Sequence, residues 1–427
     1  MFFLGYIILF SIELLLSINK FHKIINIVSI FTGIWCVFGA VSSLGLYDLR
    51  IPNGIVHVYA WLFVFIVDSI ILTFMTNKKM DIERNTNLAL SNNHRAFKIQ
   101  LFSLILIVPM VLKVVSILLS SGSLSTIRQM YFSGNNFSSM YLDMLFRIIP
   151  MSLLNALIIY FVYFSFETKK RKYLYYSLFN TILVTIINGG RYAIILLLYS
   201  IIIMWITGNV DVSKTFIDTR YKKKIKKITM ILVAIMILVT IRRGQELLKN
   251  IVIYFSGSLS YLDYILENAP QFALNQRLHG YLTFAAFIEP VVLLLKFCGL
   301  TTAKVPSYEF NMYCQGFHDI GNGNITVLFN ANTSIIYYFL RDFGWIGIII
   351  GAIFISLIIV KAYNKWQSGN RFYGMVFIYL VNILFNSLMT YQLVGVGPFF
   401  AILALYFITQ RKFVFGKSLK KVGDQYE

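Results

Sequence analysis

Long apolar runs dominate this chain and leave it few ways to fold. Runs of about 15 to 25 apolar residues recur from Met1 to Gln410. Hydrophobic residues make up 58% of the chain and charged residues 13%, whereas about a quarter of the residues of soluble domains are charged. Backbone groups inside a bilayer find no water, so segments this apolar must satisfy them as helices. The sequence therefore predicts an all-α polytopic membrane protein.

No stretch between the apolar runs is long and polar enough for a separate soluble domain, so residues 1–427 are expected to form a single integral membrane domain. The first run lacks the basic start and cleavage site of a signal peptide, and we expect it to remain as a span. About eleven transmembrane helices are predicted, at residues 2–18, 24–46, 55–76, 99–119, 144–166, 173–189, 191–208, 228–241, 343–360, 372–390 and 398–410.

Basic residues fall mainly on one side of these predicted spans. Most of the 38 Lys and Arg residues lie in the loops after alternate spans, such as 209–227, and in the tail after residue 410. Because positively charged loops stay in the cytoplasm, we expect an external N-terminus and a cytoplasmic C-terminus. The formal charge of +20 then reflects orientation in the membrane, and no nucleic acid is expected as a partner.

The longest stretch that is not plainly a span, residues 242–342, is expected to form one large extracytoplasmic loop. Its apolar segment 281–300 is long enough to cross a bilayer. A single crossing would move the later basic loops outside, and Glu289 and Pro290 interrupt the segment. We therefore expect re-entrant or interfacial helices, although two crossings made together with residues 251–265 would keep the same orientation.

Arginines gather at the predicted outer face. Arg191 lies at the glycine-rich tip of a predicted hairpin, and Arg242 and Arg243 follow the next predicted span. Arginine holds phosphate oxygens through paired hydrogen bonds and keeps its charge. The pattern favours a clamp for a lipid diphosphate, to which Arg277 is also assigned. Interfacial arginines that reach lipid phosphates are the simpler alternative.

His279, His318 and Asp342 are the candidates for a catalytic base. A histidine with a pKa near neutrality can take a proton from a sugar hydroxyl. Loop histidines are more often solvated or capping residues, and a carboxylate at the position of Asp342 is favoured by the nearby helix N-terminus alone. The residues themselves leave the choice open.

Charged residues within a span raise the free energy of membrane insertion, by roughly 2.5–3.5 kcal/mol for Lys, Arg or Asp at a helix centre. Arg147 lies four residues after Asp143, a spacing that suits an ion pair on one helix. Glu13 and Asp68 lie within spans, and we expect Asp68 to pair with Lys113. Such a pair is either structural or part of a proton or substrate path.

Three motifs resemble the oligosaccharide repeat-unit polymerases, the Wzy-type enzymes of O-antigen and capsule. They are "GGR" at 189–191, "RRGQE" at 242–246 and "NANTSIIYYFLRDFGWIG" at 330–347. The span number and the dominant loop in the second half are similar too. The resemblance implies a glycosyltransferase-C-like fold and a metal-independent site, without a cofactor, in which arginines hold a diphosphate.

The resemblance also implies the reaction. A growing glycan would pass from undecaprenyl diphosphate to the next lipid-linked repeat, on the outer face of the bacterial inner (cytoplasmic) membrane, with a chain-length regulator and a flippase as expected partners. Asp48, where metal-dependent relatives of the wider fold carry an acid, becomes a fourth candidate base. An O-antigen ligase and a lipid-linked oligosaccharide flippase are the alternatives. The large loop and the lack of two similar halves favour the polymerase over the flippase.

Overall fold

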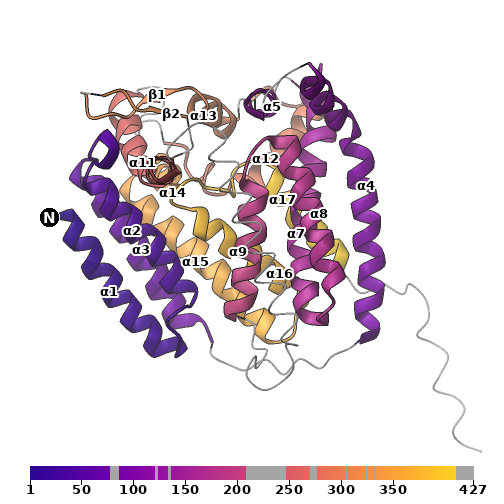
Figure 1. Cartoon of the computed structure of the whole chain (residues 1–427), viewed down its shortest axis with the longest axis horizontal. Helices are drawn as coiled ribbons and strands as arrows, with labels where there is room; N and C mark the ends of the chain where they lie inside the picture. The colour runs from indigo at the N-terminus through magenta and orange to yellow at the C-terminus, as the bar shows by residue number, and fades with distance from the viewer. Residues whose placement is uncertain are drawn as a thin grey trace, which may run out of the picture.

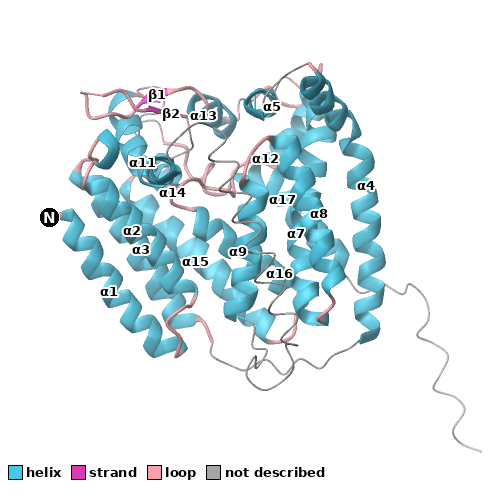
Figure 2. Ribbon diagram, viewed as in Figure 1, coloured by secondary structure: helices cyan, strands magenta, loops and turns pink. Residues whose placement is uncertain are grey.

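The computed structural model is all-helical apart from one short hairpin (Figures 1 and 2). It describes residues 1–76, 86–120, 124–132, 136–207, 247–269, 277–303, 305–323, 325–330 and 333–409. Within these ranges, five helices are long and apolar enough to cross a membrane. They are α1 (Phe2–Phe21), α3 (Gly54–Phe74), α4 (Thr86–Leu119, apolar from Asn93), α15 (Trp345–Gln367) and the run Tyr141–Thr168, which contains η2 (Met144–Ile148) and α7 (Ile149–Thr168).

Five further helices complete the bundle. They are α2 (Ile27–Ser43), α8 (Arg171–Asn188), α9 (Tyr192–Thr207), α16 (Arg371–Asn386) and α17 (Gly397–Thr409). Each predicted span within the described residues therefore contains a helix, whereas the span predicted at 228–241 lies outside them. The largest difference in bounds is at α4, which begins at Thr86 and not near residue 99.

The remaining elements lie around one end of the bundle. They are η1 (Leu46–Asp48), α5 (Leu124–Phe132), α6 (Met140–Asp143), α11 (Leu247–Asn268), α12 (Ala285–Phe297), α13 (Pro306–Cys314), β1 (His318–Asp319), β2 (Leu328–Phe329) and α14 (Ile335–Phe343). We call the described residues between 247 and 330 the cap, and the end of the bundle that carries them the cap end (Figure 1).

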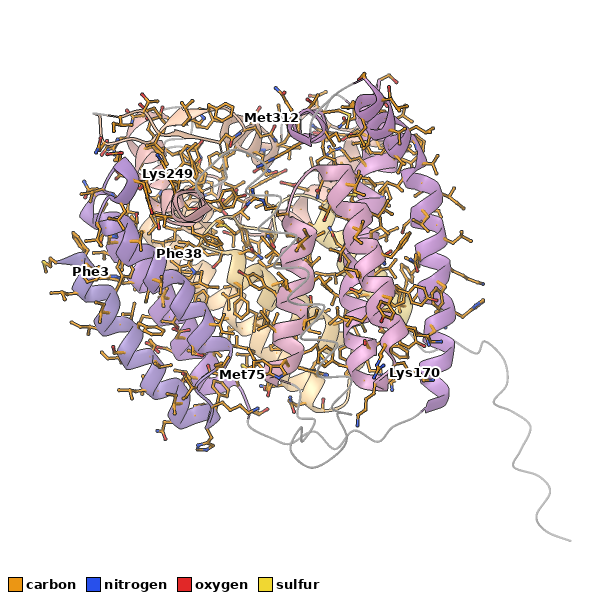
Figure 3. All side chains as sticks on the ribbon, in the orientation of Figure 1. Phe3, Phe38, Met75, Lys170, Lys249 and Met312 are labelled. Atoms are coloured by element: carbon orange, nitrogen blue, oxygen red, sulfur yellow. The ribbon has the colours of Figure 1, made fainter. Side chains whose placement is uncertain are left out.

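Loops that the sequence assigns to one side meet at the same end of the bundle. Away from the cap, Arg371 at the start of α16 pairs with Glu167 at the end of α7, with a distance of 2.7 Å between Nε and Oε1. Lys170 lies at this opposite end, whereas Lys249 and Met312 lie at the cap end (Figure 3). The alternation of basic and less basic loops along the sequence thus corresponds to two ends of one bundle.

The bundle has two halves. The central helix of one half is α7, which is buried along nearly its whole length and is surrounded by α4, α8, α9 and α17. A helix that is apolar on every side belongs in the interior. The other half is built by α1, α2 and α3, and α15 joins it to the rest by packing along α3 (Figure 1).

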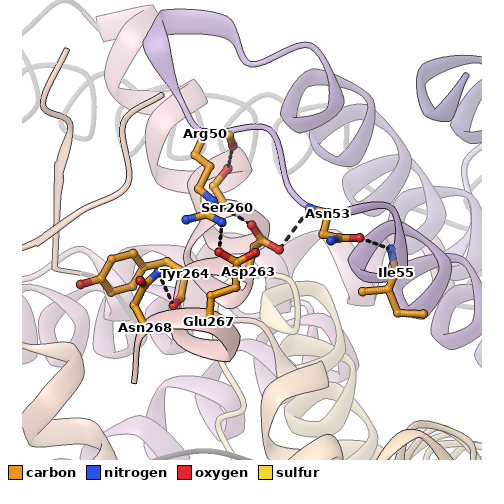
Figure 4. A network of polar contacts seen from close by, with 8 residues as sticks. All are labelled: Arg50, Asn53, Ile55, Ser260, Asp263, Tyr264, Glu267 and Asn268. Carbon is orange, nitrogen blue, oxygen red and sulfur yellow. Dashed lines mark hydrogen bonds and ion pairs between the residues drawn. The ribbon is translucent and has the colours of Figure 1, made fainter. Parts of the chain in front are cut away.

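The loop between α2 and α3 fastens the cap to the bundle. Arg50 Nε donates to Asp263 of α11 at 2.8 Å, and the same guanidinium pairs with Glu267 (Figure 4). Asp263 also accepts a hydrogen bond from Asn53 N at 3.1 Å. The backbone of the same loop adds to the hairpin, since Arg50 N donates to the Ile320 carbonyl at 2.9 Å. The loop between α2 and α3 and the cap therefore form one structural unit.

The helix α12 begins inside the bundle and ends at the cap end. At its start Phe284 packs on Phe354, near the middle of α15, with ring centroids 4.9 Å apart. At its other end the Lys296 carbonyl accepts a hydrogen bond from the Tyr141 hydroxyl at 3.1 Å, next to the cap-end start of the α7 run. The segment 281–300 thus reaches the depth of mid-α15 and ends at the cap end, without passing through the bundle.

Glycines set the angle between α14, which is buried along its whole length, and α15. Gly344 has φ 67° and ψ −153°, a conformation essentially restricted to glycine. A Cβ on Gly347 would lie 2.0 Å from the Phe339 carbonyl oxygen, and one on Gly351 would lie 2.4 Å from the Phe339 ring. This close approach holds the end of α14, which carries Asp342, against the start of α12.

We expect Gly347→Ala to lower the stability of the protein, because the added methyl group meets the Phe339 carbonyl. Overpacking of this kind costs about 1–3 kcal/mol. Gly33→Ala is a matched control, since a Cβ there would meet only a ring atom of Phe10 at an ordinary 3.6 Å. Thermal unfolding of both detergent-purified variants provides the measurement. Equal melting temperatures for the two variants would contradict the proposed corner.

Candidate functional site

Three segments meet where α12 begins, and we call their meeting point the junction. They are residues 277–284, residues 387–396 between α16 and α17, and α14. Tyr391 is buried, and its hydroxyl donates to the Thr283 carbonyl at 2.7 Å. The first backbone N–H of α14 donates to the Ser387 carbonyl at 2.8 Å. Irregular backbone inside an apolar bundle is tolerated only where protein covers it or where it lines a cavity. The junction is therefore a candidate functional site.

Asp342 organises the junction from the end of α14. Its side chain is fully buried, and its two oxygens accept hydrogen bonds from Leu282 N at 3.1 Å and from Thr283 N at 2.6 Å. Burial raises the pKa of Asp342, and the hydrogen bonds that it accepts work in the opposite direction. Both carboxylate oxygens are thus engaged in fixing the turn that leads into α12.

Glu289 is a second buried carboxyl of the junction, with 3% of its surface exposed. It accepts a hydrogen bond from the Ser307 hydroxyl and another from the backbone N–H of Gly395. Burial raises the pKa of Glu289 to about 7, against the effect of these two hydrogen bonds. The nearby Tyr281 hydroxyl is buried and has no hydrogen-bond partner among the described residues. A carboxyl poised near neutrality can take up or release a proton at physiological pH.

Sequence reasoning did not select Glu289 as a functional residue. It treated Glu289 and Pro290 only as an interruption of the apolar run at 281–300. The available signal was a carboxylate beside a proline within a run that is otherwise long enough to cross a membrane. Its partners come from two other segments, which no spacing in the sequence relates to it.

Arg277 and His279 lie at the edge of the junction, and both are exposed. The backbone N–H of His279 donates to the Asp342 carbonyl at 3.2 Å, so this stretch follows the end of α14. The guanidinium of Arg277 lies over Gly344, where a Cβ would be 3.0 Å from Nη2. Three residues chosen from the sequence, Arg277, His279 and Asp342, are therefore brought together.

His318 lies in the cap, in a cluster of aromatic rings. Its Nε2 is 2.9 Å from the Tyr313 carbonyl oxygen. Because a carbonyl only accepts, Nε2 carries the proton of this hydrogen bond. The His318 ring centroid lies 4.4 Å from that of Tyr313, 5.4 Å from Tyr261 and 5.7 Å from Tyr264. We call these four residues the aromatic cluster.

Arg191 lies in the turn between α8 and α9, at the cap end, as the hairpin prediction required. The turn is held by Gly190 N, which donates to Asn188 Oδ1 at 2.7 Å. Burial lowers the pKa of Arg191, and the positive charge of Arg128 lowers it further, while Tyr254 raises it. Arg191 thus lies beside the N-terminus of α9, where the charge of Arg128 and the helix dipole both add positive potential. Such an arrangement favours an anion.

Arg242 and Arg243 lie outside the described residues. Asp48 lies in η1, where its carbonyl accepts from Asn322 N at 2.9 Å. The ion pair between Arg147 and Asp143 is confirmed, with Arg147 Nε donating to Asp143 Oδ1 at 2.7 Å. In the part of the chain that the structure describes, no three His, Cys, Asp or Glu side chains converge in a way that could hold a metal ion.

Comparisons with protein-family models, with curated proteins and with solved structures found no match for this chain.

The stability of the protein should depend on pH through Glu289. The pKa of Glu289 is about 7 in the folded chain, against an ordinary value of 4.5. Between pH 4.5 and about pH 7, the folded state therefore keeps a proton that the unfolded state has released. The free energy of unfolding should therefore fall as pH rises through this window. Glu289→Gln should remove this part of the pH dependence of the melting temperature. An unchanged dependence in Glu289→Gln would show that the carboxyl titrates normally.

Asp342→Asn should destabilise the junction by about 1–3 kcal/mol. The amide has only one acceptor oxygen, so one of the two backbone N–H groups, that of Leu282 or that of Thr283, would face the NH₂ group and lose its hydrogen bond. Asp319→Asn is the matched control. One oxygen of Asp319, Oδ1, accepts from both Gly321 N and Val327 N at 2.9 Å, and an amide oxygen can do the same. Thermal unfolding should separate the two variants. A smaller loss for Asp342→Asn than for Asp319→Asn would refute this role of Asp342.

Proposed function

We propose that this chain is an oligosaccharide repeat-unit polymerase, a membrane glycosyltransferase that joins lipid-linked repeats. The observation that carries the proposal is the half-buried Arg191 in the glycine turn at the N-terminus of α9, on which the positive charge of Arg128 acts. A diphosphate leaving group gains negative charge in the transition state, and fixed guanidinium groups stabilise that charge. The motifs at 189–191 and 330–347 support the same function by resemblance.

In this proposal the bundle crosses a bacterial cytoplasmic membrane about eleven times, with a glycosyltransferase-C-like arrangement. The cap end faces outside, together with the N-terminus, and the C-terminus is cytoplasmic. The basic loops at the end opposite the cap support this orientation. The donor and the acceptor are both glycans on undecaprenyl diphosphate, and a chain-length regulator and a flippase act alongside the enzyme.

An apolar groove beside α12 suits the hydrocarbon chain of such a carrier. It lies between α12, α16 and α17 and is lined by Ala286, Phe287, Phe372, Phe399, Ile402, Leu403 and Tyr406. Ala286 lies one helical turn before Glu289 on α12. A lipid chain in the groove would bring the attached head group toward the cap end beside the junction.

The reaction requires a base and a diphosphate clamp. A hydroxyl of the acceptor sugar attacks the anomeric carbon of the donor, its proton passes to the base, and the bond from that carbon to the diphosphate oxygen breaks. Glu289 suits the base best because its pKa is about 7. Asp342 acts as a positioning residue, since both of its oxygens are held by backbone N–H groups. Arg191 and Arg128 hold the departing diphosphate.

The exposed side chains near the junction suit the acceptor glycan. Arg277 and His279 offer hydrogen-bond donors to sugar hydroxyls at its edge. The aromatic cluster offers the half-buried rings of Tyr313 and His318, whose faces are apolar and whose edges are polar. His318 then binds sugar and leaves proton transfer to Glu289.

Arg191→Ala and Arg128→Ala should each abolish long polysaccharide while leaving the protein in the membrane, because the diphosphate loses charge stabilisation. Arg242→Ala should do the same if this third arginine joins the clamp. Arg191→Lys should retain partial activity, since lysine keeps the charge but loses the paired hydrogen bonds. Gel profiles of surface polysaccharide and immunoblots of the membrane provide the measurements.

Lys249→Ala is the control for general loss of positive charge, because Lys249 is an exposed basic residue at the same end of the bundle. It should leave the polymer unchanged. A normal polysaccharide profile in both Arg191→Ala and Arg128→Ala would refute the clamp.

A further inference from the structure

The helices α1, α2 and α3 enclose polar side chains that the proposed reaction does not use. Glu13 of α1 is 1% exposed and Asp68 of α3 is fully buried. The charge of Glu13 acts on Asp68, and both carboxyl groups act electrostatically on the buried Cys36 thiol of α2. Glu13 Oε2 and Asp68 Oδ1 have no hydrogen-bond partner among the described residues. Two ionised carboxylates would repel strongly in such an apolar interior.

No described basic side chain neutralises this pair. The sequence led us to expect an ion pair between Asp68 and Lys113, and this prediction is wrong. Lys113 Nζ lies instead over the ring of Phe137, 4.4 Å from its centroid. The reason is that α4 packs on α7 and η2, in the other half of the bundle from α3. Asp68 is therefore left without a counter-charge in the part of the chain that is described.

The hydroxyl of Thr32 indicates the protonation state of Asp68. Thr32 Oγ1 lies 2.8 Å from the Val28 carbonyl oxygen and 2.5 Å from Asp68 Oδ2. A threonine hydroxyl has one hydrogen, and a carbonyl oxygen has none to donate. Both contacts are full two-centre hydrogen bonds only if Thr32 donates to Val28 while Asp68 carries a proton and donates it to Thr32; an ionised Asp68 would leave the one hydrogen of Thr32 shared between two acceptors. The geometry thus favours a neutral carboxylic acid at Asp68.

Further proton-exchanging groups continue from this pair toward the cap end. The Tyr6 hydroxyl lies against α2, where a Cβ on Gly39, three residues after Cys36, would be 2.8 Å from it, and it is 3.0 Å from His57 Nδ1. Tyr6 is 1% exposed and His57 is fully buried. His57 Nε2 has no partner among the described residues. His57 lies near the cap-end start of α3, about three helical turns from Asp68.

We propose that Glu13 and Asp68 form a proton-binding site inside the bundle, and that Cys36, Tyr6 and His57 connect this site with the cap end. The pair holds at least one proton at neutral pH, on Asp68 Oδ2 in the observed geometry. Of the helices packed against α3, α1 supplies Glu13 and α2 supplies Cys36, whereas α11, α14 and α15 supply no described titratable group that acts on Asp68. The ligand is a proton, so the site gives the protein a proton-dependent property separate from glycan transfer.

A hydrophobic carbodiimide tests the site in the wild-type protein, reconstituted at full length in lipid vesicles. Dicyclohexylcarbodiimide adds to a protonated carboxyl buried in an apolar environment, and the O-acylurea that forms rearranges to a stable N-acylurea. Peptide mass spectrometry should find this adduct on Asp68 or Glu13. Glu267 is the control carboxyl, because it is exposed, lies outside the apolar interior and pairs with Arg50, so it should stay unlabelled. The absence of an adduct on both Glu13 and Asp68 would overturn the proposal.

Infrared spectroscopy of the same vesicles gives a second measurement that does not depend on a reagent. Because the protonated fraction of Glu289 absorbs in the same region, the wild-type spectrum is compared with that of Asp68→Asn. The difference between the two should contain the carbonyl stretch of a protonated carboxylic acid. In D₂O this band should shift as the proton exchanges, and Tyr6→Phe should slow that shift several-fold. A difference spectrum without the band would overturn the site, and an unchanged exchange rate in Tyr6→Phe would overturn the connection.

Discussion

The structure depends on satisfying non-helical backbone inside an apolar bundle. Residues 277–284 and 387–396 leave the helical pattern at the depth where α12 begins, and their N–H and C=O groups need partners in an apolar environment. Asp342 supplies two acceptors to the first segment, and the Tyr391 hydroxyl joins that segment to the second. The glycines at the α14–α15 corner allow α15 to pack closely on α14, the helix that carries Asp342. Backbone satisfaction thus fixes α12, and with it Glu289.

The ionisable groups divide between the two halves of the bundle according to their chemistry. In the half centred on α7, positive charge lies at the cap end beside the N-terminus of α9, and the junction adds a carboxyl of near-neutral pKa. In the half built by α1, α2 and α3, two carboxyls lie deeper and without a counter-charge among the described residues. The first set suits the binding of an anion and a proton transfer to Glu289. The second suits the storage of a proton, and the two proposals can therefore fail independently.

The sequence predicted the helices well and the side-chain partners poorly, for physical reasons. Apolar runs locate helices because burial and backbone satisfaction act along the chain. The pair Asp143 and Arg147 was predictable because both residues lie on one helix. The partner of Asp68 was not, since the pattern of one helix does not say which neighbour it faces, and Lys113 proved to be in the other half. Glu289 was missed for the same reason: Ser307 and Gly395 come from distant segments. Arg128 became a candidate only through the action of its charge on Arg191.

The glycan profile of a strain that lacks this gene tests the central claim most directly. Surface polysaccharide and lipid-linked intermediates would be compared by gel and mass spectrometry, with the strain carrying the gene as reference. A repeat-unit polymerase predicts single repeats, at the surface or on the carrier outside the membrane, and no long chains. Repeats trapped on the cytoplasmic leaflet would instead identify a flippase, and long chains that stay on the carrier would identify a ligase. Either result would contradict the account.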